Sequence, residues 1–345
     1  RTGKIKYIVW FALATSALAT THALMTMIFV PIAIIWTAYW LIREKWSNLF
    51  KIVWGGVIGF GLSAFYILPV IFERKFAHVE SMLSGYFDYR AHFVSLYKLF
   101  LSMEWGYGSS GFPNEKLNLN LGIVQWLVAF VIVPILAVFN FKKKKKFSLL
   151  AIGLVCLSLV SVFMIHMKSS FIWAQLPPLW YMQFPWRFLA VSIFLLCILA
   201  GFAVYFAGRF KYILGIVLVI ASFVLTISFY VPKAWLNIND AEKFSGVSWE
   251  KQLTISIFDY LPIYATLPPV QKAPPVPEVL EGNVKFLEYK KGSDFQKGTI
   301  EASKDSLIRI PLFDFPGMKV KIDGKAVQHV NNDCRGEKYC LGLIT

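Results

Sequence analysis

Long uncharged apolar segments constrain the fold of this chain more than any other feature of its sequence. Residues 7–42 carry no formal charge, and residues 188–207 form another uncharged apolar run. A helix needs about 20 apolar residues to cross the hydrocarbon core of a bilayer, so the first run is long enough for two spans and the second for one. With 57% hydrophobic and only 16% charged residues over 345 positions, the whole chain has the composition of a polytopic membrane protein.

Seven transmembrane helices are predicted, which makes the fold class a membrane all-α bundle followed by a small β domain. The first run breaks at Thr20-Thr21-His22-Ala23. The third predicted span holds Gly55, Gly59 and Ser63 at four-residue spacing, a pattern typical of close helix packing. The predicted spans cover residues 5–21, 24–42, 52–72, 117–141, 147–167, 185–207 and 212–231. An outer loop at 73–116 follows the third span, and a segment at 168–184, which we call the lip, precedes the sixth.

The basic residues predict the orientation of these spans. The dense basic groups at residues 1–6, 43–51, 142–146 and 209–211 all fall on one side, which the positive-inside rule makes cytoplasmic. The outer loop, the lip and the C-terminal region then lie outside the cytoplasmic membrane. The five lysines at 142–146 are interpreted as a topology signal, with contact to anionic lipids as the alternative. Much of the net charge of +15 lies in short loops and no nucleic-acid-binding motif is visible, so nucleic acid is not an expected partner.

The lip joins the sixth span through the sequence Gln183-Phe184-Pro185-Trp186-Arg187, which stands directly before the uncharged run 188–207. Pro185 suits the first turn of a helix, and Trp186 suits the level of the lipid headgroups. Arg187 places a permanent cation at the mouth of the span. Upstream, Pro177-Pro178 breaks an apolar run, so the lip is expected to lie along the membrane surface or to re-enter it, and not to cross it.

After residue 231 the sequence pattern changes. Residues 232–282 are rich in proline and are expected to form a linker. The runs at 284–289, 306–310 and 318–322 alternate apolar and polar residues, and Asp323-Gly324 marks a tight turn. Residues 283–345 are therefore predicted to form a small extracytoplasmic antiparallel β domain, a sandwich with its last strands missing. The chain begins at Arg1 and ends within a predicted strand, so we expect it to be a fragment.

The four cysteines fall into two pairs. Cys156 and Cys197 lie within predicted spans and are expected to be small buried apolar residues. Cys334 and Cys340 lie in the predicted β domain, where an oxidising compartment would favour a local disulfide. Whether these two pair is left open by the sequence.

Several motifs, taken together, resemble a known family. They are Phe184-Pro185-Trp186-Arg187-Phe188, Asp259-Tyr260-Leu261-Pro262, Phe315-Pro316-Gly317-Met318-Lys319-Val320 and Ile322-Asp323-Gly324-Lys325. With the multiple spans, they resemble the later part of the YfhO-like bacterial membrane proteins, and equally of the membrane proteins labelled as related to 6-pyruvoyl-tetrahydropterin synthase. Both groups are similar to the C-type glycosyltransferase (GT-C) superfamily, whose members take a sugar from a polyprenyl-phosphate carrier and use it outside the cytoplasm. Relatives more often have Glu at the position of Asp259.

The resemblance implies that the catalytic acid lies in the first large extracytoplasmic loop, close to the N-terminus of the whole protein. No loop of this chain matches that one, so the acid would lie upstream and no catalytic residue is carried over. The motifs at residues 184–187 and 259–262 match the family without an established role.

Sugar transfer from a lipid phosphate needs a cation to stabilise the departing phosphate. Arg187 is the main candidate, because a guanidinium forms paired hydrogen bonds with phosphate oxygens; snorkelling to the headgroups is the alternative. Lys168, at the other end of the lip, could assist, and Trp186 is grouped with these residues as substrate-binding. His22 lies at the outer end of two spans and is either a substrate contact or a turn residue.

The same reaction needs a carboxylate to activate the acceptor. Glu104, within Met103-Glu104-Trp105-Gly106-Tyr107, and Asp88 are the candidates in the outer loop. Each is equally well a solvated loop acid, and Asp88 is equally well the ion-pair partner of Arg90. The remaining histidines show no metal-ligand spacing, and no nucleotide-binding loop or serine-hydrolase motif is present. No cofactor is evident, and a divalent metal is left open.

The sequence therefore favours a glycosyltransferase-like membrane protein that transfers a sugar from a polyprenyl-phosphate donor to a cell-envelope acceptor. Its expected partners are the lipid-linked sugar donor, membrane lipids, and an envelope glycan or glycolipid. A non-catalytic transporter or envelope scaffold is the alternative. The sequence determines neither the sugar, the acceptor nor the oligomeric state.

Overall fold

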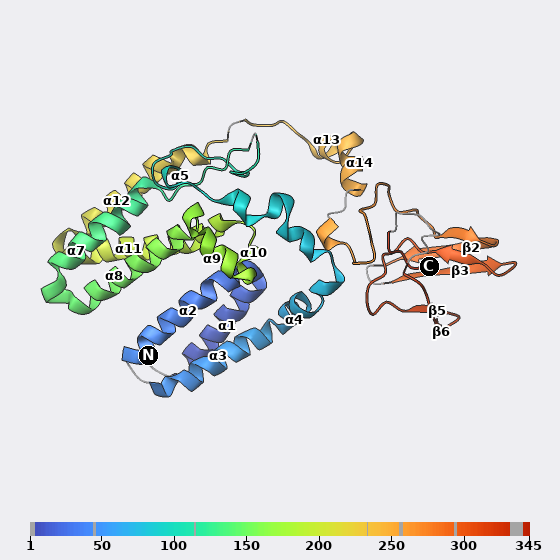
Figure 1. Ribbon diagram of the computed structural model, residues 1–345, viewed down its shortest axis with the longest axis horizontal. Helices are drawn as coiled ribbons and strands as arrows, with labels where there is room; N and C mark the ends of the chain where they lie inside the picture. The colour runs from blue at the N-terminus through green and yellow to red at the C-terminus, as the bar shows by residue number, and fades with distance from the viewer. Residues whose placement is uncertain are drawn as a thin grey trace. The chain divides into compact units, whose positions relative to one another are not determined.

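The chain folds into two compact units in the computed structural model, which describes residues 4–43, 46–113, 115–232, 234–254, 258–292, 295–331 and 341–345. The helical unit comprises Arg1–Leu68 and Met82–Trp235. The C-terminal unit comprises Leu236–Thr345 together with the distant segment Pro69–Ser81. Both units are drawn in Figure 1 and are described separately below.

Four helices in the described residues are long and apolar enough to cross a membrane. They are α2 (Ala23–Arg43), α8 (Phe141–Phe163), Pro185–Phe206, which includes α11 (Leu189–Phe206), and Gly208–Tyr230, which includes α12 (Lys211–Thr226). A bent pair, α3 (Leu49–Leu62) with its leading turn and α4 (Ala64–Phe72), would make a fifth. The helices α1 (Ile5–Thr21) and Ile123–Phe139 are apolar but shorter. The chain is thus a helical membrane-protein candidate with four or five evident spans, and the number seven stays a prediction.

The third predicted span is not a single straight helix. Its two halves differ in direction by 76° across Ser63. The Ser63 hydroxyl donates to the carbonyls of Gly59 and Phe60 at 3.1 and 3.0 Å, and Pro69 lies inside α4. A serine that bonds to its own helix and a proline both distort the regular helical hydrogen-bond ladder, which accounts for the bend.

The fourth and fifth predicted spans also have different bounds. The helix predicted from residue 117 begins only at Ile123, as α6 (Ile123–Leu127), a π-helical turn (Val128–Ile132) and α7 (Val133–Phe139). Residues 117–121 instead belong to the folded outer loop, where Asn118 and Gly106 exchange backbone hydrogen bonds. α8 is assigned from Phe141 to Phe163, but the backbone of Lys144 is not helical, with φ of −133° and ψ of 38°. The lysine run therefore contains a kink, which separates a short leading turn from the long apolar part of the helix.

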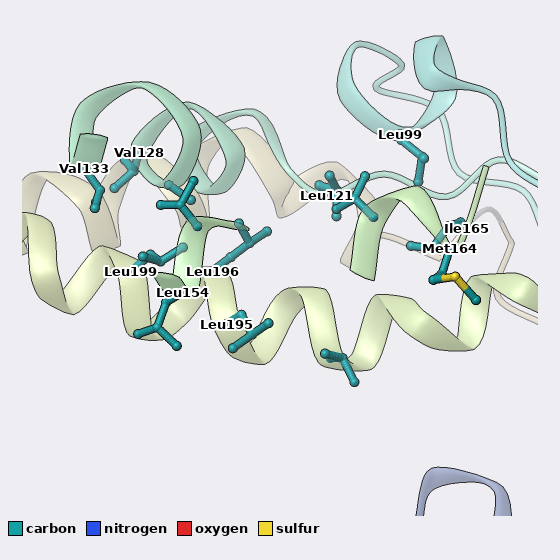
Figure 2. Packing of buried hydrophobic residues seen from close by; sticks show 14 of the residues in the cluster. Leu99, Leu121, Val128, Val133, Leu154, Met164, Ile165, Leu195, Leu196 and Leu199 are labelled. Atoms are coloured by element: carbon teal, nitrogen blue, oxygen red, sulfur yellow. The ribbon is translucent and has the colours of Figure 1, made fainter. Parts of the chain in front are cut away.

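The core of the helical unit lies between α7, α8 and α11. Leu154 from α8 and Leu195, Leu196 and Leu199 from α11 are buried there, and Figure 2 shows them with Val128 and Val133. Small residues bring α8 and α11 close together, and the hydroxyls of Ser161 and Ser192 are 2.9 Å apart across the interface. Cys156 and Cys197 are exposed on these helices, so their expected burial is wrong: they face outward from the core.

The glycine pattern of α3 forms a helix contact, as predicted. Gly55 and Gly59 are buried against α1. A Cβ atom added at Gly59 would lie 2.7 Å from the carbonyl oxygen of Ala12 and 2.7 Å from Cβ of Thr15. Only a residue without a side chain allows the two backbones to approach this closely.

The C-terminal unit contains a small antiparallel β region, but its described strands form three separate ladders where a sandwich was expected. β1 (Glu278–Glu281) pairs with β4 (Leu307–Arg309), β2 (Val284–Lys291) with β3 (Gln296–Ala302), and β5 (Val320–Ile322) with β6 (Lys325–Val327). The turn predicted at Asp323-Gly324 joins β5 and β6, and its two residues have φ of 49° and 80°, as a type I′ turn requires. Cys334 and Cys340 lie outside the described residues.

The proline-rich segment is more ordered than a linker. It contains α13 (Asp240–Lys243), α14 (Gly246–Thr254) and strand β1. Asn239 and Glu242 form a capping box at the start of α13. The later part of the segment also holds Pro69–Ser81 in this unit: the Ile263 N–H donates to the Phe76 carbonyl at 2.8 Å, and the His78 ring stacks on Phe258 with centroids 4.1 Å apart.

Candidate functional site

The lip is built from short helical turns around one buried tryptophan. α9 (Ser170–Gln175) and α10 (Pro177–Trp180) are separated at Leu176, because Pro177 and Pro178 can start a helix but cannot continue one. Trp173 is fully buried, its Nε1–H donates to the Met164 carbonyl at 3.1 Å, and Tyr89 of the outer loop stacks on its ring at 5.3 Å. Trp173 therefore anchors the lip between the end of α8 and the outer loop.

A tight turn at residues 182–187, which we call the lip turn, carries Arg187. Gln183 has a φ of 60°, a left-handed conformation that residues other than glycine seldom adopt, and the chain reverses there before Pro185 begins a 3₁₀ turn. The Arg187 Nη1 donates to the Met182 carbonyl at 2.8 Å, and its guanidinium lies over the Phe184 ring at 4.9 Å. One donor of the guanidinium thus closes the turn.

Arg187 is half-buried and has no carboxylate partner among the described residues. The sequence from Lys116 to Asn239 contains neither Asp nor Glu, so the helices around Arg187 provide none. A guanidinium has five N–H donors. Apart from the Nη1 bond to Met182, the part of the chain that the structure describes offers them no acceptor. Positive charge that is partly withdrawn from water and unpaired in this way favours the binding of an anion.

Aromatic side chains of the outer loop surround the lip turn. Phe184 makes edge contacts with His92 and Tyr86, with ring centroids 4.6 and 6.4 Å apart. Trp186 contacts Tyr107 at 5.9 Å, and Phe112 stacks on Tyr86 at 6.0 Å. We call this group the aromatic cluster: Tyr86, Phe87, Tyr107, Phe112, Phe184 and Trp186.

Hydrogen bonds hold the outer loop together and tie it to the end of α8. The Val94 N–H donates to the Ile165 carbonyl at 3.1 Å, and the Leu121 N–H donates to Leu99 at 2.9 Å. The hydroxyls of Ser109 and Ser110 donate to the carbonyls of Ala91 and Phe93 at 2.6 and 2.8 Å. These bonds fix the aromatic cluster in place without regular secondary structure.

Two buried donors in the lip turn have no hydrogen-bond acceptor among the described residues. They are Gln183 Nε2 and Trp186 Nε1. An unpaired buried donor costs about 1–3 kcal/mol, so such groups are rare and call for an explanation. Together with Arg187, they give the lip turn three side chains with unused donors within five consecutive residues.

The two candidate carboxylates differ in their surroundings. Asp88 accepts hydrogen bonds from Arg90, the shortest at 2.6 Å from Nη2, and also caps the 3₁₀ turn Tyr89–His92. The Arg90 side chain thereby holds the pKa of Asp88 below its ordinary value, which makes this carboxylate a poor base. Asp88 thus forms an ion pair with Arg90, which the sequence offered as the alternative to a catalytic role. Glu104 is exposed, and its backbone N–H donates to the Ser102 hydroxyl at 3.3 Å.

The remaining candidates are spread over the helical unit. Lys168 is exposed, and its backbone N–H donates to His166 Nδ1 at 3.2 Å. Burial and the nearby Lys168 lower the pKa of His166. His22 is exposed where α1 ends, and its backbone caps that helix. Trp186 and Arg187 are therefore the two predicted residues that the structure brings together with the aromatic cluster.

Sequence reasoning missed Glu115. Residues 106–109 run antiparallel to residues 115–118, and the Glu115 carboxylate lies against Gly108, where an added Cβ would be 3.0 Å from its Oε2. Burial raises the pKa of the Tyr86 phenol, and the negative charge of Glu115 adds to the rise. Glu115 is thus an exposed carboxylate beside the aromatic cluster. The glycines at 106 and 108 were the available signal, because they mark a close backbone approach.

The described residues contain no group of three or more His, Cys, Asp or Glu side chains placed to hold a metal ion. No protein-family model matches the chain, and neither a curated protein nor a solved structure is similar to it at a significant level.

Proposed function

We propose that this protein binds the phosphate of a polyprenyl-phosphate sugar at the lip turn and transfers the sugar to a cell-envelope acceptor on the outer face of the cytoplasmic membrane. The unpaired, half-buried Arg187 is the observation that carries the proposal. It lies at the start of an apolar helix long enough to span a bilayer, where a lipid phosphate would reside.

The surroundings of Arg187 suit a lipid-linked sugar. Phosphate oxygens would accept hydrogen bonds from the guanidinium and, after a local opening of the turn, from Gln183 and Trp186. The exposed aromatic rings of Tyr107 and Phe112 offer apolar faces for a sugar ring. In the transfer, an acceptor oxygen attacks the anomeric carbon, the bond from that carbon to the phosphate oxygen breaks, and the acceptor proton passes to a carboxylate. Glu115 is the carboxylate beside the cluster, and an acid outside this chain, as the family resemblance implies, is the alternative.

The first experiment measures binding of a polyprenyl phosphate to the purified chain in detergent, with the phosphate-free polyprenol as the reference. Arg187→Ala should weaken polyprenyl-phosphate binding by about ten- to a hundredfold, because a hydrogen bond to a charged group contributes about 1.5–3 kcal/mol. Arg187→Lys should recover part of it, since the charge remains and the paired geometry does not. Arg90→Ala is the matched control, because Arg90 is an exposed arginine already paired with Asp88. Unchanged binding in Arg187→Ala would remove the lip turn from the proposal.

A second experiment separates an enzyme from a scaffold or transporter. Membranes that contain the protein are given a polyprenyl-phosphate donor with a labelled sugar, and label in envelope material is counted. An enzyme is supported if sugar transfer depends on Arg187. It is also expected that Glu115→Gln lowers the transfer while polyprenyl-phosphate binding is retained. Phosphate binding without any transfer supports a non-catalytic carrier.

A further inference from the structure

A second charged surface lies at the other end of the helical unit, where several helices begin or end. The exposed cations there come from the start of α1, the end of α2, the start of α8 and the turn after α11: Lys4, Lys6, Arg43, Lys142, Lys143, Lys145, Lys146, Arg209 and Lys211. We call these nine residues the basic end. In Figure 1 these helix ends lie on the left side of the helical unit.

Two contacts confirm that separate helices meet at the basic end. The Lys146 ammonium, on α8, lies 5.4 Å from the ring centroid of Trp40 on α2. The Lys144 Nζ donates to the Tyr205 carbonyl of α11 at 3.2 Å and lies 4.0 Å from the Tyr205 ring. The start of α8 is therefore close in space to the ends of α2 and α11, which lie far from it in the sequence.

Negative charge is missing from this surface within the described residues. Over the described part of the helical unit, the acids are Asp88, Glu104 and Glu115, all in the outer loop. Glu44, next to Arg43 in the sequence, lies outside the described residues. Within the described residues no carboxylate balances the repulsion between the clustered cations, so anions from outside the chain would stabilise the surface.

The aromatic residues favour a lipid headgroup as the anion. Arg43 lies over Tyr39 at 5.2 Å, Arg209 over Phe210 at 4.8 Å and Lys211 over Tyr212 at 4.8 Å. Aromatic side chains beside cations at the ends of apolar helices are typical of a membrane interface, where the ring is in contact with lipid and the charge reaches the headgroups. Exposed apolar helix sides, such as those of α12, continue directly from this surface.

We propose that the basic end binds anionic phospholipid headgroups and prefers them to zwitterionic ones. This inference is independent of the sugar-transfer proposal, since it concerns other residues and another ligand. Lys142, Lys143 and Lys145 provide exposed charge for this binding, whereas Lys144 is already committed to Tyr205.

The test titrates phosphatidylglycerol, and separately phosphatidylcholine, into the full chain in detergent and measures lipid retained per protein. Combined Lys142→Gln, Lys143→Gln and Lys145→Gln changes should weaken phosphatidylglycerol binding at least about tenfold, because each lysine near an anionic surface contributes on the order of one tenfold step or slightly less. Phosphatidylcholine binding should not change. The matched control combines Lys116→Gln, Lys285→Gln and Lys304→Gln, three exposed lysines outside the basic end, and should bind phosphatidylglycerol as the unaltered chain does.

The three lysines changed together to arginine keep the charge and should keep the binding. Added salt should weaken phosphatidylglycerol binding to the unaltered chain, which tests the inference even where the glutamine variant does not fold. Three results would each overturn the inference. The first is full phosphatidylglycerol binding by a folded glutamine variant, and the second is equal binding of both lipids. The third is displacement of the lipid by inorganic phosphate or an RNA oligonucleotide at a similar concentration of charge.

Discussion

Gln183 combines two unfavourable features in a single residue. Its φ of 60° costs an L-amino acid about 1–2 kcal/mol, and its buried Nε2 has no acceptor. The neighbouring hydrogen bonds hold it there: its own N–H donates to Trp180 at 3.0 Å, and the Arg187 N–H donates to Phe184 at 3.0 Å. A strained backbone conformation that its surroundings enforce is commonly found at functional sites. Here the strained conformation of Gln183 is part of the turn that holds Arg187.

Asp88 gives a prediction with a defined pH dependence. Arg90 lowers the pKa of Asp88, so the stabilisation by this ion pair is present above the ordinary pKa near 3.8 and is lost as the pH falls through the lowered value. Asp88→Asn should cost less than about 1 kcal/mol at pH 7, because exposed ion pairs are weak and asparagine still caps the turn. The difference should shrink as the pH falls below about 3.8. Thermal unfolding followed by tryptophan fluorescence from pH 7 to 2.5 measures it.

Asp88→Ala serves as the comparison variant. It removes the cap as well as the charge and should cost about 1 kcal/mol more at pH 7. An Asp88→Asn penalty that stays constant down to pH 2.5 would show that the ion pair is not its source.

The elements show what an apolar run can and cannot reveal. The runs predicted helices in the correct places because burial of the backbone in an apolar environment requires helical hydrogen bonding. They did not reveal the bend at Ser63 or the extended course of residues 117–121, because apolarity alone does not separate a helix from a buried loop segment. The lip motif and Arg187 were visible in the sequence. The sequence did not reveal Tyr86, Tyr107 and Glu115 as their neighbours, because the contact between these residues and the lip turn depends on the long-range packing of the outer loop.

The contact between α1 and α3 makes a prediction about two glycines of one helix. Gly59→Ala should destabilise the helical unit by about 1–3 kcal/mol, because its Cβ would overlap the Ala12 carbonyl and the Thr15 side chain. Gly61→Ala should be neutral or slightly stabilising, because no atom lies within 4 Å of the added Cβ and alanine favours a helix. Thermal unfolding of both variants in the same detergent makes the comparison. Equal effects would contradict the close packing at Gly59.

The two units of the whole chain are not consecutive in sequence. Pro69–Ser81 belongs to the C-terminal unit although the helical unit resumes at Met82. His78 is buried in that unit, with Nε2 2.7 Å from the Ala265 carbonyl and Nδ1 2.9 Å from Glu80. The sequence assigned residues 69–72 to the third span and 73–81 to the outer loop, because no local pattern marks pairing with residues almost 200 positions away.

Removal of the His78 side chain should loosen the C-terminal unit selectively. His78→Ala loses buried hydrogen bonds and the stacked contact with Phe258, at a cost of about 1–3 kcal/mol. Limited proteolysis should then cut within residues 236–345 several-fold faster, while the helical unit resists as before. His22→Ala is the matched control, because His22 is exposed at a helix end. Equal protease resistance of His78→Ala and the unaltered chain would show that Pro69–Ser81 does not stabilise the unit.

The divided C-terminal unit has a consequence for synthesis on the ribosome. Pro69–Ser81 is translated before the roughly 150 residues that separate it from Leu236, so at about 5–20 residues per second it waits roughly 8–30 s for its partner segment. During that interval Phe76 and His78 have none of the contacts that later cover them. The nascent chain therefore carries an unfilled docking segment while the later apolar helices are made, and a chaperone that holds this segment would act before residues 236–345 exist.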